Sequence, residues 1–163
     1  MEFWEDFDSL FAFKQKITYP GKLATDIEGN RKALGNTLFI DRLLNALGIE
    51  EETSLYPPTG NASLRKLHSR IVSSSFPAHE KQSILYYILR DLSVDDTPSK
   101  FAERSFLPEN YRLFVDGLWY LDRLEFKVGC SQTLILHWCN GSTNAHVSAC
   151  PPGDVKYRLL YDA

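Results

Sequence analysis

Apolar side chains recur every three or four positions along most of the first 126 residues of this chain. This spacing places them on one side of an α-helix, whereas a strand with one buried face would alternate apolar and polar residues. Such alternation is absent from this part of the sequence, so the pattern predicts an all-α fold. The first predicted helical segment, 3–13, has its apolar stripe at Phe3, Phe7, Leu10 and Phe11.

Proline and glycine residues divide the rest of this region into further helices. Gly48 follows the last apolar position of one helix and suits a left-handed C-cap. Pro77 opens another helix, where its missing N–H costs nothing in the first turn. The predicted helices cover residues 22–34, 36–47, 61–72, 77–92, 97–104 and 108–126, with a loop at 49–60.

The two most apolar segments, 83–92 and 108–126, are predicted to form the core, because each is apolar around more than half of its circumference. Charges in the second segment share its narrower side. Gly117 within this segment either allows another helix to approach closely or is tolerated neutrally. The apolar anchors of the second segment are Tyr111, Phe114, Val115, Leu118 and Leu121, and its charges are Asp116, Asp122, Arg123 and Glu125. Together the helices predict one domain over 1–126, a solenoid-like bundle of helical pairs.

After Lys127 the helical period is lost, and glycine, proline and serine become frequent. We therefore expect an irregular tail over 127–163. Its histidines and cysteines supply four weak candidates for zinc ligands, which are His137, Cys139, His146 and Cys150. Their spacing lacks the tight Cys-x2-Cys pairs of structural zinc sites, so we expect no bound metal and no other cofactor.

Composition narrows the class of protein further. Hydrophobic residues make up 44% and charged residues 24% of the 163 residues, as in ordinary globular domains. The net charge of −3 predicts no general attraction to nucleic acid or to anionic membranes. The longest apolar run, Ile84–Leu89, is far shorter than the ~20 residues of a membrane-spanning helix. With three cysteines and an acidic, aromatic N-terminus, the chain is expected to be intracellular.

Motifs for phosphate binding and for nucleophilic catalysis are absent, and the acidic clusters at 50–52 and 95–96 are typical of caps and solvated turns. We therefore expect neither enzymatic activity nor a small-molecule substrate. One helix is locally basic, because Arg65, Lys66 and Arg70 lie opposite its apolar residues. These three cations are the candidate partner-binding residues, suited to an acidic surface, and a merely solvated face is the alternative.

Three stretches of the sequence carry a resemblance to a known family. They are FDSLFAF, then IEGNRKALGNTLFIDRLLNALGI, then FPAHEKQSILYYILRDL with FAERSFLPENYRLFVDGLWYLDRLEF. Together they resemble the ELYS-like domain of fungal nuclear pore proteins over residues 3–126, and FAERSFLP followed by a DGLWYLD helix is the most specific part. The resemblance implies an α-helical scaffold protein in the Y-shaped subcomplex of the nuclear pore, and not an enzyme.

The resemblance also implies partners and a location, namely other nucleoporins of that subcomplex at the nuclear envelope. Direct contact with nucleic acid and insertion into a membrane are not expected. The resemblance stops at Phe126, where Lys127–Cys130 interrupts the expected helix, and one interpretation of 127–163 is a frame-shifted or mis-spliced segment. Two alternatives remain open from the sequence: a small metal-dependent enzyme that uses the His/Cys tail, and a free-standing helical adaptor that binds peptides in a groove.

Overall fold

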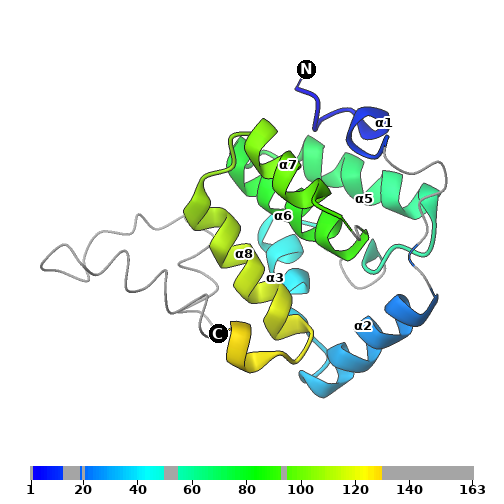
Figure 1. Ribbon diagram of the computed structural model, residues 1–163. Helices are drawn as coiled ribbons and strands as arrows, with labels where there is room; N and C mark the ends of the chain where they lie inside the picture. Colours follow the sequence, from blue (N-terminus) through cyan, green and yellow to red (C-terminus); the bar gives the residue numbers. More distant parts are fainter. Residues whose placement is uncertain (1, 13–18, 20, 50–54, 93–94, 130–163) are drawn as a thin grey trace, which may run out of the picture.

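The computed structural model describes residues 2–12, 19, 21–49, 55–92 and 95–129 of the chain. Within these ranges every regular element is a helix and no strand is present, so the predicted all-α class is confirmed. The helices are α1 (Phe7–Leu10), α2 (Gly21–Ala33), α3 (Phe39–Ala46), α5 (Asn61–Ser73), α6 (Ala78–Leu92), α7 (Thr97–Arg104) and α8 (Glu109–Asp122). Figure 1 shows α1 and α2 at opposite ends of the molecule, with α3, α6 and α8 between them.

Helix α6 is the centre of the bundle. It contacts α3, α5, α7 and α8, and every residue from Gln82 to Leu89 is buried. A helix apolar on nearly all sides can only be stable when neighbours cover it all round, which is why four helices surround this one. On α8, the predicted anchors Phe114, Val115 and Leu118 are buried and face the same core. The prediction that these two segments form the core is therefore confirmed for α6 and α8, whereas Leu124 and Phe126, at the end of the second segment, are exposed.

The first helix is shorter than the sequence pattern indicates. Residues 3–13 were predicted to be helical, but α1 contains only four residues, Phe7–Leu10. The side chain of Asp6 accepts a hydrogen bond from the Ser9 N–H at 2.8 Å, so the helix begins after Asp6. The turn before it buries Trp4, which is 2% exposed. The apolar side chains of this segment therefore reach the core from a turn as well as from a helix.

Four helices end in the same hydrogen-bonded turn, the Schellman motif, in which one residue takes a left-handed conformation. The left-handed residues of these turns are Gly35 (76°), Gly48 (73°), Phe106 (53°) and Leu124 (62°), and Asn36, which follows Gly35, also has a positive φ of 67°. The closing bonds, 2.8 to 3.0 Å long, run from Asn36 N to Arg31 O, Ile49 N to Leu44 O, Leu107 N to Ala102 O and Glu125 N to Tyr120 O. The predicted C-cap at Gly48 is thus confirmed. At Phe106 and at Leu124, the left-handed conformation costs roughly 1–2 kcal/mol per residue, because Cβ crowds the following carbonyl.

Helix α8 was predicted to continue to residue 126, but it ends at Asp122 because Leu124 turns the chain. Residues 126–129 are helical again, so the first part of the expected irregular tail is regular. A Cβ atom on Gly129 would lie 2.8 Å from Leu121 Cγ and 3.0 Å from the Gly117 oxygen, so this segment folds tightly against α8. The contact is with the carbonyl oxygen of Gly117, so which of the two predicted roles this glycine has stays a prediction. The remainder of the expected tail, 130–163, lies outside the described residues, and the boundary at 126 stays a prediction.

The core assignment can be tested at Leu118, which is 4% exposed in the middle of α8. Leu118→Ala is expected to lower the free energy of unfolding by about 2–5 kcal/mol, because it removes apolar contacts and leaves a cavity. Denaturant unfolding of the full chain measures this change. Leu124→Ala is the matched control, since Leu124 is 37% exposed and the same truncation there removes much less buried surface. Equal midpoints for the Leu118 variant and the parent would show that this stripe of α8 is not buried.

Candidate interaction surface

The three predicted partner-binding residues all lie on the outer side of α5. Arg65, Lys66 and Arg70 are exposed, whereas the apolar residues of the same helix are buried against α6. The buried residues of α5 are Leu64, Leu67, His68 and Ile71. The apolar side of α5 holds the helix on the core, and its basic side is exposed on the surface of the bundle.

Arg65 also has a role inside the molecule. Its guanidinium is 2.6 Å from the Asp8 carboxylate and lies over the Phe7 ring, 4.1 Å from the ring centroid. These contacts tie α5 to α1, and both side chains of the ion pair remain about half exposed or more, so the pair contributes little to stability. Arg65 therefore serves the attachment of α1, and a substitution there would change two features at once.

His68, on the opposite side of α5, belongs to the core. It is 4% exposed, and its Nε2 lies 2.9 Å from the Trp4 carbonyl oxygen. Its ring meets the rings of Phe7 and Phe11 edge to face. Burial lowers the pKa of His68, so the neutral imidazole is favoured in the folded protein. These contacts assign His68 to the packing of α1 on α5.

The weak zinc candidates His137, Cys139, His146 and Cys150 lie outside the described residues, so the structure does not test them. In the part of the chain that is described, no three histidine, cysteine, aspartate or glutamate side chains gather in an arrangement that could hold a metal ion. Among the same residues, no helix is long and apolar enough to cross a membrane.

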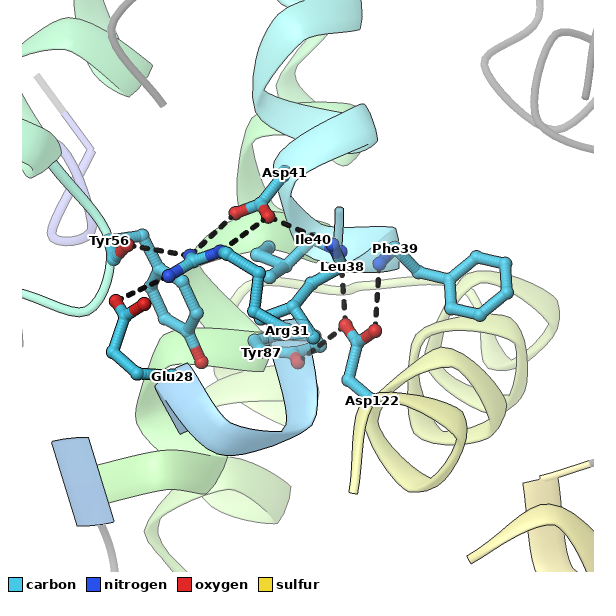
Figure 2. A network of polar contacts seen from close by, with 9 residues as sticks. All are labelled: Glu28, Arg31, Leu38, Phe39, Ile40, Asp41, Tyr56, Tyr87 and Asp122. Atoms are coloured by element: carbon cyan, nitrogen blue, oxygen red, sulfur yellow. Dashed lines mark hydrogen bonds and ion pairs between the residues drawn. The ribbon is translucent and has the colours of Figure 1, made fainter. Parts of the chain in front are cut away.

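One buried carboxylate, Asp122 at the end of α8, holds the beginning of α3 (Figure 2). Its two oxygens accept hydrogen bonds from the backbone N–H groups of Phe39 at 2.7 Å and of Ile40 at 3.0 Å. The hydroxyl of Tyr87, from α6, donates a third bond at 2.8 Å. Leu38, which precedes α3, has no side-chain acceptor for these amides, so Asp122 performs from another helix the role of an N-cap residue.

A second carboxylate, Asp41, completes this helix start and joins it to α2. It accepts the Leu38 N–H at 2.8 Å and two hydrogen bonds from the Arg31 guanidinium, each 2.9 Å long. Arg31 also donates to the Tyr56 carbonyl oxygen at 2.8 Å and pairs with Glu28 on its own helix. Figure 2 shows these contacts around the first turn of α3. Arg31 and Asp41 are 6% and 2% exposed, so this is a buried ion pair with further hydrogen bonds.

A third buried carboxylate, Asp91 near the end of α6, collects four donors. The hydroxyls of Tyr19 and Tyr56 donate to it at 2.9 and 2.6 Å. From α8 and the residue that follows it, the Trp119 indole donates at 2.9 Å and the Arg123 guanidinium at 2.7 Å. Burial raises the pKa of Tyr19 and of Tyr56 well above the ordinary value, so both hydroxyls keep the protons that they donate.

Sequence reasoning missed these carboxylates as structural residues and grouped Asp122 with the charges on the narrower side of the helix. The structure corrects that grouping, because Asp122 is 4% exposed. A signal was present: Asp122 lies four positions after Leu118 and seven after Val115, within the apolar stripe itself. Asp116 is also only partly exposed, since its carboxylate pairs with Arg90 and accepts a hydrogen bond from Tyr86.

Burial raises the pKa of Asp122 from its ordinary value of 3.8 to about 6, although the three hydrogen bonds oppose this shift. Because the pKa is higher in the folded than in the unfolded state, the folded protein binds more protons between these two values. The stability from this group is therefore fully present below pH 4 and is lost as the pH rises through about 6.

A comparison with Asp122→Asn isolates this effect from all other titrating groups. Between pH 7 and pH 5 the parent is expected to gain about 1 kcal/mol of unfolding free energy relative to the variant, because only the parent takes up the proton at residue 122. Urea unfolding at both pH values measures the difference. In Tyr87→Phe the carboxylate loses one donor, so the same gain should persist and shift to higher pH. Parallel pH profiles for the parent and Asp122→Asn would contradict the assignment.

Comparison with known proteins places this architecture in a family. A family model described as ELYS, nuclear pore complex assembly, matches residues 37–137, a range that includes every helix from α3 to α8. The chain is also similar to the "Uncharacterized protein ely5" of Schizosaccharomyces pombe, with 34% identity over 135 residues. That similarity covers 81% of this chain and 44% of the relative, so the chain spans less than half of the relative's length. No solved structure matches the chain.

The expected resemblance is confirmed on two counts. The matched family is the one that the sequence motifs indicate, and the relative is a fungal protein, in agreement with the predicted branch of the family. The match covers more than half of the chain and contains the core helices α6 and α8. The chain therefore belongs to the ELYS family of nuclear pore complex assembly.

Proposed function

We propose that this chain is a structural component of the nuclear pore, within its Y-shaped scaffold subcomplex, and binds a neighbouring nucleoporin through helix faces at the nuclear envelope. The observation that carries the proposal is the match to the nuclear pore complex assembly family over residues 37–137. Assembly is a task of binding and positioning, so the family match favours a structural role over an enzymatic one.

The architecture supports this role, because a scaffold domain must keep its outer surfaces in fixed relative positions. Asp122 joins α3, α6 and α8, and Asp91 joins α6 to α8 and to Tyr19 and Tyr56. Buried hydrogen bonds of this kind are lost together when one partner moves, so they oppose sliding of one helix along another. The helices therefore present their exposed sides to a partner as a rigid set.

Among the exposed sides, we propose the basic face of α5 as a contact with the partner. Arg65, Lys66 and Arg70 give three positive charges on one short helix of a chain whose net charge is −3. An acidic patch on a nucleoporin would complement this face, increase the association rate and make binding sensitive to salt. The two alternatives, a free-standing peptide-binding adaptor and a small metal-dependent enzyme, do not require the chain to be located at the nuclear envelope.

The location and the face can be tested together with a fluorescently tagged full chain. The parent is expected to concentrate at the nuclear rim, and Lys66→Glu with Arg70→Glu is expected to weaken that signal severalfold. Arg65 is left unchanged, because its guanidinium also contacts Asp8 and Phe7 of α1. Imaging measures the ratio of rim to diffuse signal, and thermal unfolding of the purified variant checks that the domain remains folded.

The matched control is Lys22→Glu with Lys32→Glu, which makes the same change in charge on exposed residues of α2, at the end of the molecule opposite α1. This control should keep the rim signal of the parent. A diffuse signal from the folded parent would contradict the nuclear pore proposal itself. A rim signal reduced equally in both double variants would show an effect of net charge and not of the α5 face.

A further inference from the structure

The sequence contains a single place where a hydroxyl residue is followed directly by proline, Thr97–Pro98. Lys100 stands three positions after the threonine, so the segment is Thr-Pro-Ser-Lys. Proline-directed serine/threonine kinases select a proline here, because their cleft holds no acceptor for the amide after the phosphorylated residue and proline has no N–H. Many of them also favour a basic side chain at the third position after the hydroxyl. The segment therefore has the pattern that such a kinase modifies.

One structural role for a threonine before proline is that of an N-cap, but Thr97 does not occupy the cap position. Helix α7 begins at Thr97 itself, after Asp96, and Pro98 lies in its first turn. The Thr97 hydroxyl donates to the Asp95 carboxylate at 2.5 Å, and the Thr97 N–H donates to the same oxygen at 3.1 Å. The hydroxyl is thus a donor to a neighbouring carboxylate, whereas an N-cap oxygen accepts from helix amides. The role of an N-cap therefore does not account for this threonine.

The Thr-Pro-Ser-Lys segment lies on the surface. Thr97 and Pro98 are partly exposed. The exposed residues around them are Asp95, Asp96, Ser99 and Lys100. Phe101, the next residue, is 4% exposed, and its ring meets the Phe3 ring edge to face. The buried part of α7 therefore begins directly after the segment, and a kinase can contact all four residues without displacing a core side chain.

A kinase binds its substrate in an extended conformation, so the first turn of α7 has to open. The N–H groups of a first turn have no acceptor within their own helix, and Pro98 has no N–H at all. The first helical hydrogen bond that opening breaks runs from Lys100 N to Asp96 O at 3.0 Å. The side chains of these two residues form an ion pair of 2.9 Å that is 72% and 64% exposed, so it contributes little to stability. The first turn can therefore open while Phe101 keeps the rest of α7 on the core.

We propose that Thr97 is a phosphorylation site of a proline-directed serine/threonine kinase. In this reaction Thr97 Oγ1 forms a bond to the γ-phosphorus of ATP, and the bond from that phosphorus to the bridging oxygen breaks. ADP leaves with the electron pair of the broken bond, and the hydroxyl proton passes to the catalytic aspartate of the kinase. The inference goes beyond the proposed function and does not depend on it, because the kinase recognises the residues of this segment alone.

The main effect of the phosphate is on the charge of this surface. Two carboxylates and one ammonium group, those of Asp95, Asp96 and Lys100, lie next to Thr97 in the sequence, and a phosphate adds about −1.5 to −2 at pH 7. The two carboxylates repel it, whereas Lys100 and the N-terminus of α7 attract it. Since all these groups are on the surface, we expect a strongly acidic patch on a domain that stays folded.

The test uses the purified full chain with ATP and a cyclin-dependent kinase as the proline-directed probe. Mass spectrometry is expected to place the phosphate on Thr97, and Thr97→Ala should remove it. Ser99→Ala is the matched control, because it removes another hydroxyl from the same turn and should be phosphorylated like the parent. Pro98→Ala is expected to lower the initial rate about tenfold or more, because an alanine amide would lie unpaired in the kinase cleft.

Two further measurements address the folded protein and the cell. The phosphorylated chain should keep a denaturation midpoint close to that of the parent, and a sharp fall would overturn the surface role of the site. The full chain purified from fungal cells, with phosphatases inhibited, should carry the same phosphate, and an unmodified Thr97 there would overturn the inference. Phosphate only on other residues, equal rates for Pro98→Ala and the parent, or modification only after thermal unfolding would also overturn it. The proposed function is tested separately, by the nuclear rim signal.

Discussion

The carboxylate of Asp122 fixes the relative position of three core helices. It ends α8, caps the first turn of α3 and receives the hydroxyl of Tyr87 from α6. Apolar contacts alone would hold these helices together but would tolerate small shifts between them, because the hydrophobic effect is non-directional. Hydrogen bonds to two backbone N–H groups and one hydroxyl have narrow geometric limits, so the carboxylate selects one arrangement. The shape of the outer surface depends on that selection.

Around the central helix α6, too, apolar side chains supply burial and a carboxylate supplies directional hydrogen bonds. The apolar residues of α6 supply burial, while Asp91 near its end accepts hydrogen bonds from two tyrosines, a tryptophan and an arginine. Removing one donor would leave a buried carboxylate with one hydrogen bond fewer. Such a loss lowers the free energy of unfolding by roughly 1–3 kcal/mol. Charged groups thus restrict the arrangement of a core whose stability comes mainly from its apolar side chains.

Sequence patterns predicted the local part of this structure well and the tertiary part poorly. The bounds of α7 and the cap at Gly48 follow from short-range rules, since proline, glycine and apolar spacing act within one helix. The end of α8 at Asp122 could not be predicted in this way, because the turn uses Leu124, a residue that normally avoids positive φ. Likewise the capping of α3 could not be predicted, because Asp122 follows Phe39 by 83 positions and Ile40 by 82. No local sequence pattern shows contacts over such a separation. The basic face of α5 was visible in the sequence, but the contact of Arg65 with Asp8 on α1 was not.

The ion pair between Arg31 and Asp41 links α2 to the first turn of α3. Arg31 lies before the range matched by the family model, which begins at residue 37. Asp41 lies inside that range, as does Leu38, whose N–H donates to the Asp41 carboxylate. A fragment cut at the matched limits would keep a buried carboxylate and lose its counter-ion, a loss that typically costs about 3–5 kcal/mol. The stability of the first turn of α3 therefore depends on α2, a helix that lies before the segment by which the family is recognised.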